Sequence, residues 1–579
     1  MRISLLPCVA FILLGFIVFG GVANYSFISL DDPILVTENT ISHGISFKNI
    51  AGAFSSFDPE LYIPITFLSY QLNFEMGDLN PWIYHFTNLL LHIVNGLLVI
   101  LLLRKFKFSY ICSFILGILF LVHPIQVESV AWVSARKDVL SAFFLLLSIL
   151  FYLHPKEERC FYILSIIFYV LGTLSKPSII LLPLVLLCIE WYLKKKIDIS
   201  VFKRIIPYAL VSIVILIIAI IGKSNTVGAS SLIETVFIGF RNITFALEKI
   251  FLPINLSLLY PLSDKSNIII AFVWSLILIS LLFIISWKVR RKNSSLLFGL
   301  CWFLLFLLPL IVNIRKGDDF VDIYYASDRY SYLPIIGILI ILGGFIQKYL
   351  YKTVKIRNAF LVVIFIIISL SSYYSWKQVK IWEDNNILFS EVAKRVPNAY
   401  VAHQQVGIQA LMDEDYAVAV DSLSKAMSIR QTPNSAYHLG LAYMKKGELE
   451  KALQLFILTT ELNTLHAPAY LNIGVIYLRA EQFNLAEQFF IKASRLDKVS
   501  DTPFINLSLL YEHQERYFAA IESYAKALKR NPDNVFALAR ISLLHIQRNE
   551  NEFAKFYIEK ALNLEPSNVE LIEIAKKVI

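Results

Sequence analysis

The stretch from Asn358 to Asn386, NAFLVVIFIIISLSSYYSWKQVKIWEDNN, divides the chain into two parts of different composition. Its first half is an apolar run that suits the hydrocarbon core of a bilayer, which is about 30 Å thick. Runs of this kind recur through the preceding residues and stop after residue 375, where the sequence becomes ordinary and water-soluble. The chain is therefore expected to have one domain in lipid and one in water.

Apolar runs dominate the first 375 residues. Of all 579 residues, 57% are hydrophobic and 17% are charged, against about 45–50% and about 25% in soluble domains. The first run ends near Ala23 and is longer than the apolar region of a cleavable signal peptide, so we interpret it as a retained helix. The runs predict eleven membrane spans, at about residues 3–23, 86–103, 108–122, 139–153, 160–174, 178–194, 205–222, 268–287, 296–313, 331–349 and 358–374.

Lysine and arginine residues alternate along the predicted loops. Every second loop is basic, whereas the first loop of the other set, residues 24–85, is acidic. Because basic loops stay in the cytoplasm, the N-terminus is predicted to lie on the cytoplasmic side of the cell membrane. An odd number of spans then places the C-terminal region in the periplasm or outside the cell. The confinement of the basic residues to short loops argues against nucleic-acid binding, which the net charge of +9 would otherwise suggest.

A sequence period near 34 runs through the last third of the chain and resembles the tetratricopeptide (TPR) consensus. Small residues recur at one position of the period: Gly407, Gly440, Gly474, Ser508 and Ser542. Alanines recur at another: Ala419, Ala452, Ala486, Ala520 and Ala554. Small residues let paired helices approach, and a proline such as Pro532 ends the second helix. The pattern predicts about five stacked units over residues 397–579, after a connecting segment at 376–396.

Together these features predict an all-α protein, with a polytopic transmembrane helix bundle over residues 1–375 followed by a TPR α-solenoid. Stacked repeats form a concave face. We therefore favour the interpretation that this face is a groove that binds an extended segment of a partner protein. A purely structural array, or one that dimerises, is the alternative.

Two adjacent carboxylates, Asp31 and Asp32, follow the first span. At a membrane boundary such a pair is costly unless it is solvated, paired or used. Either carboxylate could act as a general base that takes a proton from an acceptor hydroxyl. The alternative is a solvated Asp-Asp-Pro turn that ends the helix.

The segment from His123 to Asp138 is too polar for lipid and too apolar for a free loop, which suggests that it lies in the interface or turns back into the protein. Glu128 and Asp138 could hold a divalent cation or polarise an acceptor. Arg136 and Lys137 could hold a phosphate. The alternative is a local ion-pair cluster of Glu128, Arg136 and Asp138 that stabilises the loop.

Three further basic residues depart from the rule that outer loops lack positive charge: Lys176, Lys249 and Arg329. Arginine offers bidentate geometry for a phosphate and lysine offers a point charge. Cations beside carboxylates on the outer side suit the leaving group of a lipid-phosphate donor. Snorkelling toward lipid headgroups is the alternative.

His85 and His92 share one face of a predicted helix, with Asn88 between them. No third ligand at metal spacing accompanies them, so hydrogen-bonded interior histidines are favoured over a metal pair. The sequence contains no Walker, dinucleotide-binding or zinc signature. The five cysteines lie in or beside apolar runs and suggest neither a metal site nor a disulfide framework.

The ordered set of these motifs resembles the transmembrane and TPR repeat-containing O-mannosyltransferases and their prokaryotic relatives, over nearly the whole chain. The motifs are Leu30-Asp31-Asp32, Tyr62-Ile-Pro64, Pro81-Trp82-Ile-Tyr84-His85 with Asn88 and His92, His123-Pro124 to Glu128, Arg136-Lys137-Asp138, Ser175-Lys176-Pro177, Tyr260-Pro261, Asp328-Arg329-Tyr330-Ser-Tyr332-Leu333-Pro334, and Trp382 with Asp384.

The resemblance implies a glycosyltransferase of the GT-C fold that uses a polyprenyl-phosphate sugar, with mannose as one candidate, and inverts the anomeric centre. Asp31 or Asp32 would be the base, and Arg136, Lys137, Lys176 or Arg329 would neutralise the leaving phosphate. Glu128 and Asp138 would bind a cation or the acceptor, so a divalent cation is the one cofactor suggested. The acceptor would be a hydroxyl of an exported protein held by the repeats.

The chain departs from the family pattern in two motifs. Ala135-Arg136-Lys137-Asp138 stands where animal members carry Gly-Arg-Ala-Asp, and Asp328-Arg329 stands where they tend to carry Glu-Arg. Charge is preserved, but the identity of the sugar does not follow from the resemblance.

Two other classes of function compete with an enzyme. A membrane-anchored TPR scaffold for exported proteins would need none of the outer charges, although eleven spans are a large anchor. A transporter or flippase would place ionisable residues in mid-helix and show paired halves, whereas here the helix centres are almost free of charge.

Overall fold

The computed structural model describes residues 5–57, 61–154, 158–194, 197–224, 232–261, 266–311 and 324–578. The chain divides into two compact units, Met1–Ala402 and His403–Ile579. The predicted all-α fold is confirmed, since the described residues contain, besides helices, one pair of very short strands. These are β1 (Tyr260–Pro261) and β2 (Tyr324–Ala326), which pair antiparallel with Tyr260 opposite Ala326.

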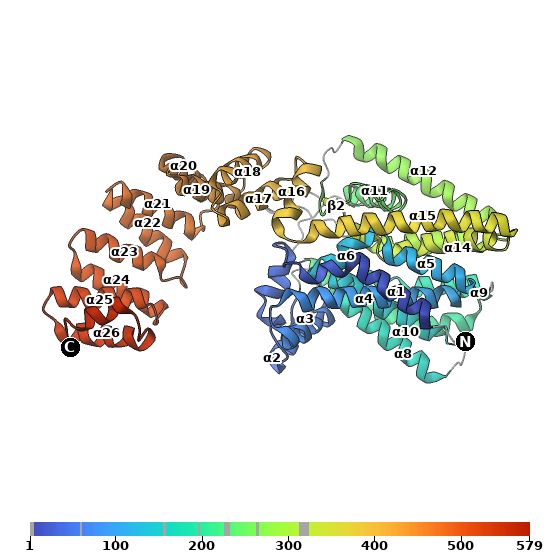
Figure 1. Ribbon diagram of the computed structural model, residues 1–579, viewed down its shortest axis with the longest axis horizontal. Coiled ribbons are helices and arrows are strands. Elements are labelled where there is room, and N and C mark those ends of the chain that lie inside the picture. The colour runs from blue at the N-terminus through green and yellow to red at the C-terminus, as the bar shows by residue number, and fades with distance from the viewer. Residues whose placement is uncertain are drawn as a thin grey trace. The chain divides into compact units, whose positions relative to one another are not determined.

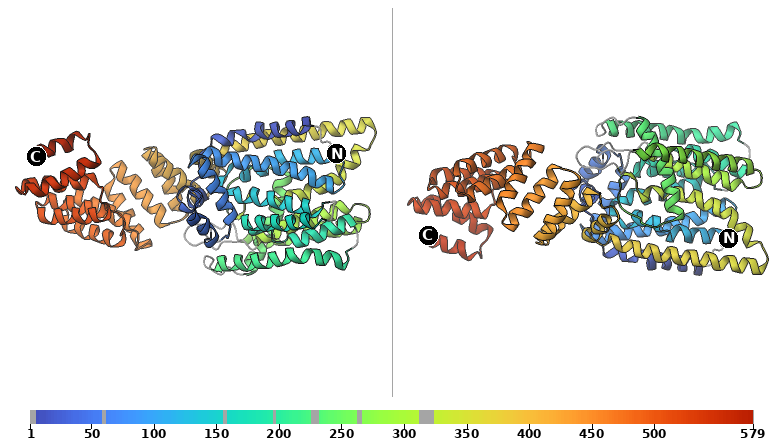
Figure 2. Two further views of the ribbon diagram at one scale, coloured as in Figure 1. Left: turned by 90° about the horizontal axis from the view of Figure 1, so that it is seen from below. Right: turned by 90° about the horizontal axis from the view of Figure 1, so that it is seen from above.

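The first unit is a bundle of long helices that run in roughly one direction or its reverse (Figures 1 and 2). Its helices and short turns are α1 (Leu5–Phe19), η1 (Gly20–Asn24), η2 (Pro33–Thr37), η3 (Thr40–Ser42), α2 (Phe47–Ser55), α3 (Pro64–Gly77), α4 (Pro81–Lys105), α5 (Tyr110–Val122), η4 (Pro124–Gln126), α6 (Val127–Ala131), η5 (Val133–Ala135), α7 (Arg136–Tyr152), α8 (Arg159–Ser175), η6 (Pro177–Ile179), α9 (Leu182–Lys194), α10 (Ile199–Ser224), α11 (Leu232–Phe251), α12 (Ser266–Val289), α13 (Ser294–Ile311), η7 (Asp328–Ser331), α14 (Pro334–Leu350), α15 (Val354–Val379), η8 (Lys380–Trp382) and α16 (Asn385–Arg395).

A helix lies over each of the eleven predicted spans. Among the described residues, five helical segments are long and apolar enough to cross a membrane, or up to six if one bent pair counts as a span. They are Leu6–Asn24, Pro81–Lys105, Ile199–Gly222, Phe272–Val289 and Val354–Trp382, with the bent pair Tyr110–Val122 and Pro124–Ala131. Several shorter apolar helices lie at other predicted spans. The chain is a membrane protein, and eleven stays a prediction of the number of spans.

One of the helices of the first unit that have no counterpart among the predicted spans is α11, which is 20 residues long. α11 contains Arg241, Glu248 and Lys249, which interrupt its apolar pattern and hide it from a search for long apolar runs. It packs against α12 and α13 and contacts η7. This helix therefore forms part of the wall around the segment that carries Arg329.

Hydrogen bonds join loops that the charge pattern assigns to the same side of the membrane. Lys105 Nζ donates to the Leu153 carbonyl at 3.3 Å, and the Ser109 amide donates to Gln347 at 2.8 Å. The Tyr162 hydroxyl donates to the Arg204 carbonyl at 2.7 Å. The predicted inner loops thus meet one another at one end of the bundle.

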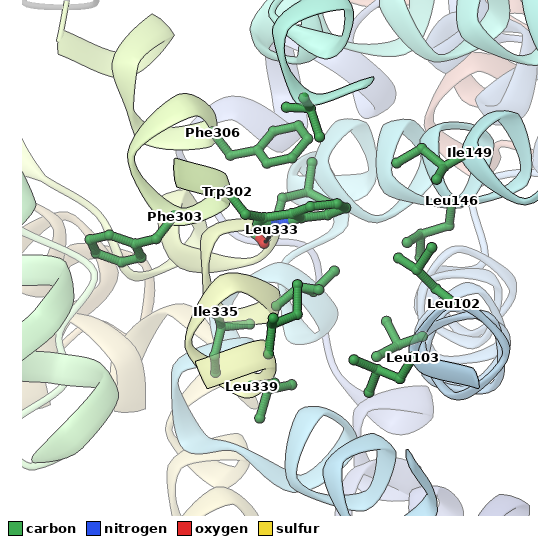
Figure 3. Close-up of a cluster of buried hydrophobic side chains, with 14 of the residues drawn as sticks. Leu102, Leu103, Leu146, Ile149, Trp302, Phe303, Phe306, Leu333, Ile335 and Leu339 are labelled. Atoms are coloured by element: carbon green, nitrogen blue, oxygen red, sulfur yellow. Dashed lines mark hydrogen bonds between the residues drawn. The ribbon is translucent and has the colours of Figure 1, made fainter. Parts of the chain in front are cut away.

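The core of the first unit lies where α4, α7, α13 and α14 pack together (Figure 3). The indole N–H of Trp302 donates to the Leu333 carbonyl at 3.1 Å. α13 and α14 touch through glycines, since a Cβ on Gly337 would lie 2.4 Å from the Gly299 carbonyl oxygen. Small residues allow such close helix crossings in membranes. This packing positions the polar segment that ends at Pro334.

The second unit is a stack of paired helices (Figure 1). Beginning with α17, which spans the division between the units, the pairs are α17 (Tyr400–Met412) with α18 (Tyr416–Ile429), α19 (Pro433–Lys446) with α20 (Leu449–Leu462), α21 (Ala467–Arg479) with α22 (Phe483–Leu496), α23 (Thr502–His513) with α24 (Tyr517–Arg530), and α25 (Val535–Gln547) with α26 (Asn551–Leu564), followed by α27 (Val569–Ala575).

The recurring small residue of each repeat faces a large side chain of the second helix. A Cβ on Gly440 would lie 2.8 Å from a ring carbon of Phe456, and one on Gly474 would lie 2.5 Å from the ring of Phe490. Equivalent turns between paired helices hold a residue of positive φ: Glu414, Gly447, Glu481, Glu515 and Asn549. The period in the sequence therefore corresponds to a period in packing and in backbone conformation.

Candidate active site

The carboxylate of Asp32 is buried and hydrogen-bonded through both oxygens. Oδ2 accepts the Ile28 amide N–H at 2.8 Å. Oδ1 accepts the Ser134 amide N–H at 2.9 Å and also the Ser134 hydroxyl. Burial raises the pKa of Asp32 from 3.8 to about 6, while the hydrogen bonds from Ser134 and Ile28 oppose the rise and the charge of Asp31 adds to it. Asp32 thereby connects the first predicted outer loop to η5, directly before α7.

Asp31, next in sequence, has the opposite surroundings. Its side chain is 41% exposed, and its carboxylate lies 3.8 Å from Lys137 Nζ. A general base must reach the proton it removes. Of the two predicted bases, Asp31 is the one whose carboxylate an acceptor can approach.

The segment between α5 and α7 is buried within the protein, in agreement with its mixed composition. α5 and the helical turns at Pro124–Ala131 meet at an angle of 52°. Glu128 on this segment accepts the Ser327 hydroxyl at 2.7 Å, the Arg329 amide N–H at 3.0 Å and the Arg329 guanidinium. Glu128 thus joins α6 to η7, two segments about 200 residues apart in sequence.

Arg329 lies against carboxylate and aromatic groups together. Its guanidinium pairs with Glu128 and lies 4.8 Å from the ring centroid of Trp132 and 5.2 Å from that of Tyr330. Burial alone would lower the pKa of Arg329, but the charge of Glu128, with smaller contributions from Asp138 and Asp31, raises it. Arg329 remains a cation beside several carboxylates.

Lys176 and Asp138 form a buried ion pair, with 2.5 Å between Nζ and Oδ1. Burial lowers the pKa of Lys176, and the charge of Asp138 opposes that shift. The Lys176 ammonium also lies 5.5 Å from the Tyr330 ring centroid. Tyr330 is therefore in contact with both cations, Lys176 and Arg329.

A small cavity of about 20 Å³, with room for about one water molecule, adjoins this pair. Its lining combines charged groups, hydroxyls and aromatic rings: Asp138, Ser141, Lys176, Ser178, Phe306, Arg329, Tyr330, Tyr332, Leu333 and Pro334. Two of the four predicted phosphate ligands line it, together with one of the two predicted cation or acceptor ligands.

Arg136 and Lys137 are the predicted phosphate ligands that do not line the cavity. The surroundings of Arg136 are those of a structural residue. Its guanidinium is fully buried and donates to the Asn88 side chain and, at 2.7 Å, to the Tyr84 carbonyl. Asn88 in turn donates to the Trp132 carbonyl at 2.9 Å. Arg136 thus supports the backbone of the segment whose Trp132 ring contacts Arg329.

The polar residues of α4 hold the site segments together. His92 is hydrogen-bonded to the Tyr332 hydroxyl at 2.8 Å and to the Leu121 carbonyl at 3.0 Å. Asn95 donates to the Val139 carbonyl at 2.8 Å and to the Tyr332 hydroxyl at 3.1 Å. His85 lies 3.4 Å from the Ser26 carbonyl. These contacts agree with the interpretation of His85 and His92 as hydrogen-bonded interior histidines.

The local ion-pair cluster that was the alternative for Glu128, Arg136 and Asp138 is not what the structure contains. Glu128 pairs with Arg329 and Asp138 pairs with Lys176, whereas Arg136 binds Asn88. Both carboxylates therefore use partners far away in sequence. Among the described residues, no group of three or more His, Cys, Asp and Glu side chains is arranged to hold a metal ion.

Sequence reasoning did not single out Ser141, Ser178 or Phe306 as site residues. Ser141 follows Asp138 by one helical turn, which could have indicated a shared face. Phe306 lies within an apolar run, where no local signal separates a cavity wall from a lipid-facing residue. Ser178 follows Lys176 by two residues, and nothing in its spacing marks it as a site residue.

Comparison with known proteins identifies the repeats. The family model described as tetratricopeptide repeat matches residues 467–499 and 503–534. Among solved structures, the MamA protein is 23% identical, with 29% of this chain and 92% of that chain covered and a TM-score of 0.27. YrrB, described as a TPR protein with an unusual peptide-binding site, is 14% identical over 32% of this chain and 97% of its own, with a TM-score of 0.28. No functional statement rests on these two likenesses.

Curated relatives match parts of the chain. Protein O-mannosyl-transferase TMTC2 of Mus musculus is 40% identical over 99 residues, 17% of this chain and 12% of its own length. Protein O-mannosyl-transferase F38B6.6 of Caenorhabditis elegans is 24% identical over 404 residues, 67% of this chain and 55% of its own. The chain thus spans about an eighth of the first relative and about half of the second. In its repeats, its apolar helices and its relatives, the chain is similar to the TMTC-like transmembrane, TPR-containing proteins.

Proposed function

We propose that this protein is a membrane glycosyltransferase that moves a sugar from a polyprenyl-phosphate donor to a hydroxyl of an exported protein. The observation that carries the proposal is the gathering of Asp31, Lys137, Asp138, Lys176 and Arg329 in one neighbourhood beside a cavity. Charged groups at the ends of membrane helices are costly and are retained for function. The names of the relatives, which are protein O-mannosyl-transferases, support the same reaction class.

Asp31 is the proposed general base. The acceptor hydroxyl oxygen attacks the anomeric carbon of the donor while its proton passes to the Asp31 carboxylate. The bond between that carbon and the phosphate oxygen breaks, and polyprenyl phosphate leaves with both bonding electrons. A single displacement of this kind inverts the anomeric centre. Asp32 acts as a positioning residue, because its oxygens already accept three hydrogen bonds.

The leaving phosphate is neutralised by cations rather than by a proton. Lys176 and Arg329 line the cavity, and Lys137 lies beside the proposed base. Cations that are held in place before the reaction stabilise charge as it develops in the transition state. In the structure each of these cations is paired with a carboxylate. The donor phosphate would therefore share the cations with Asp138, Glu128 and Asp31.

The repeats are the proposed acceptor-binding part. Their stacked helices suit an extended polypeptide segment, and the basic loops of the membrane part favour an orientation in which repeats and site both face the outer side of the cell membrane. Flipped lipid-linked donors would be used on that side.

The test measures release of free polyprenyl phosphate from labelled polyprenyl-phosphate mannose by the purified full chain, with exported host proteins as acceptors. Release by the wild type with label on protein is expected, and Asp31→Asn should abolish it. Asp78→Asn, an exposed change in the same loop, serves as the matched control. Addition of EDTA tests the divalent cation that Glu128 and Asp138 were predicted to hold.

Other outcomes redirect the proposal. Label on lipid or polymer would retain the transferase and change the acceptor class. Failure to release polyprenyl phosphate from any sugar donor, with capture of exported proteins preserved, would support the scaffold instead.

A further inference from the structure

The predicted connecting segment, residues 376–396, packs against the candidate active site. It lies within the first compact unit, which ends at Ala402. The side chain of Trp382 is 2% exposed and stacks on Trp132, with 6.1 Å between the ring centroids. Trp132 is the ring that also contacts Arg329. A segment that only links two domains is expected to be exposed and to make few contacts, so this one has a further role.

Asn385, the first residue of α16, is bonded to the loop that carries Asp31. Its Oδ1 accepts the Ser29 amide N–H at 2.8 Å and the Ser29 hydroxyl at 3.1 Å. Ser29 precedes Asp31 by two residues, whereas Asn385 lies 356 residues further along the chain. The Ser26 amide also donates to the Glu383 carbonyl at 3.0 Å. The connecting segment thus holds the backbone immediately before the proposed base.

The backbone on the other side of Asp31 is held by Asp32, whose carboxylate accepts hydrogen bonds from Ile28 and Ser134. Asp31 therefore lies between two fixed points, at Ser29 and at Asp32. Its own side chain is 41% exposed and contributes little packing. The position of the Asp31 carboxylate is therefore set by the backbone that these two contacts hold.

An ordinary role for an asparagine at the start of a helix is to cap it. In α16 that role is taken by Asp384, whose side chain accepts the Ile387 amide N–H at 2.8 Å. The helix therefore does not need the Asn385 oxygen for its own N-terminus. That oxygen is directed to Ser29 instead.

We propose that Asn385 is a positioning residue of the transfer reaction, which fixes the loop of the base so that the Asp31 carboxylate meets the acceptor hydroxyl. This inference rests on the proposed transferase function and extends the site to the segment that leads into the repeats. The proposed phosphate-binding cations Lys176 and Arg329 lie on other segments. Loss of the Asn385 contact should therefore slow transfer without weakening donor binding.

The test compares variants of the full chain with polyprenyl-phosphate mannose, glucose or galactose, whichever the wild type uses. Asn385→Leu removes the acceptor oxygen at similar volume and should lower kcat by roughly 10- to 100-fold, because small misplacements of a reacting group are costly. The KM for the donor should not change. Asn386→Leu, at an exposed position next along α16, is the matched control and should leave both parameters unchanged.

Rescue by Asn385→Asp separates positioning from a general structural role. The carboxylate retains an oxygen that accepts both Ser29 bonds, so kcat should return close to the wild-type value. It is compared on the plateau of the pH–rate profile, because the added charge raises the pKa of a nearby carboxyl group. Failure of Asn385→Asp to restore kcat, or a rise in donor KM that matches the fall in kcat, would overturn the inference and leave the transferase.

Amide hydrogen exchange tests the contact without an activity assay. Deuterium uptake by the peptide that contains Ile28 to Asp32 should rise in Asn385→Leu and stay at the wild-type level in Asn385→Asp and Asn386→Leu. Unchanged uptake in Asn385→Leu would overturn the inference alone. Should Asn385→Leu fail to fold, Asn385→Ala removes the same oxygen with less bulk and takes its place. A wild type inactive with all three donors would overturn the proposed function, and this inference with it.

Discussion

Asp31 and Asp32 are neighbours in sequence but differ in every physical respect that matters to a base. Asp32 is fully buried and accepts three hydrogen bonds, whereas the side chain of Asp31 is 41% exposed and lies beside Lys137. The sequence left the choice between them open, because spacing cannot report solvent access. At this scale the exposed position of Asp31 supports the proposal that it, and not Asp32, is the base.

Separate substitutions of the two residues should separate chemistry from structure. Asp31→Asn should abolish transfer with little change in thermal stability, because an exposed side chain contributes little to folding. Asp32→Asn should reduce stability by about 1–3 kcal/mol, because an amide cannot accept hydrogen bonds from all three donors. Transfer rates and thermal unfolding of both purified variants provide the measurement. Full activity of Asp31→Asn would show that the base lies elsewhere.

Asp32 should also give the stability of the protein a measurable pH dependence. Its folded-state pKa of about 6 exceeds the ordinary value of 3.8, so protonation favours the folded state. Its contribution is therefore greatest below about pH 4 and falls as the pH rises to about 6. Between pH 7 and pH 5 the wild type should gain about 1 kcal/mol relative to Asp32→Asn. Thermal unfolding of both proteins at the two pH values checks this; a constant difference would contradict the raised pKa.

At the scale of elements, the contact between α13 and α14 sets the position of the site. The backbones meet at Gly299 and Gly337, and α14 follows directly after the segment that holds Arg329 and Tyr330. Polar side chains of α4, such as Asn95, reach the same region through Tyr332. The packing of α4, α13 and α14 therefore determines where the site residues lie relative to one another.

A methyl group at this crossing should be costly. In Gly337→Ala the new Cβ would lie 2.4 Å from the Gly299 carbonyl oxygen, and the backbone on both sides must shift. Overpacking of this kind costs about 1–3 kcal/mol. Gly344→Ala on the same helix is the control, since its nearest contacts are 3.3 Å away. In thermal unfolding, the melting temperature of Gly337→Ala should be well below that of Gly344→Ala. Equal melting temperatures would refute the close crossing.

At the scale of the whole molecule, the charge pattern predicts that the basic loops and the candidate site lie on opposite sides of the membrane part. The predicted inner loops meet one another through contacts such as Lys105 with Leu153. The carboxylates and cations of the site come from the predicted outer loops. The charge pattern therefore predicts that the two groups of loops face different compartments.

Impermeant thiol reagents should reveal this division in intact cells. Met76 lies at the predicted outer side and Tyr351 at the predicted inner side. Their side chains are 70% and 75% exposed, so cysteines introduced at these positions should be accessible. Met76→Cys and a repeat-domain variant, Val499→Cys, should react in intact cells, whereas Tyr351→Cys should react only after permeabilisation. The background carries Cys160→Ser, because Cys160 is exposed. The reverse labelling pattern would show that the protein has the opposite orientation in the membrane.

The sequence by itself determined the helices, the repeats and the gathering of functional motifs in predicted outer loops, because apolar length, a period near 34 and charge bias are local signals. It predicted Asp31, Asp138, Lys176 and Arg329 as candidates from their unusual settings. Only the tertiary structure decided that Asp32 is buried, that Arg136 supports α4 and Trp132, and that Asp138 and Glu128 pair with residues far along the chain. Burial, pairing and the cavity beside Tyr330 depend on contacts between segments distant in sequence, and such contacts leave no pattern within any one segment.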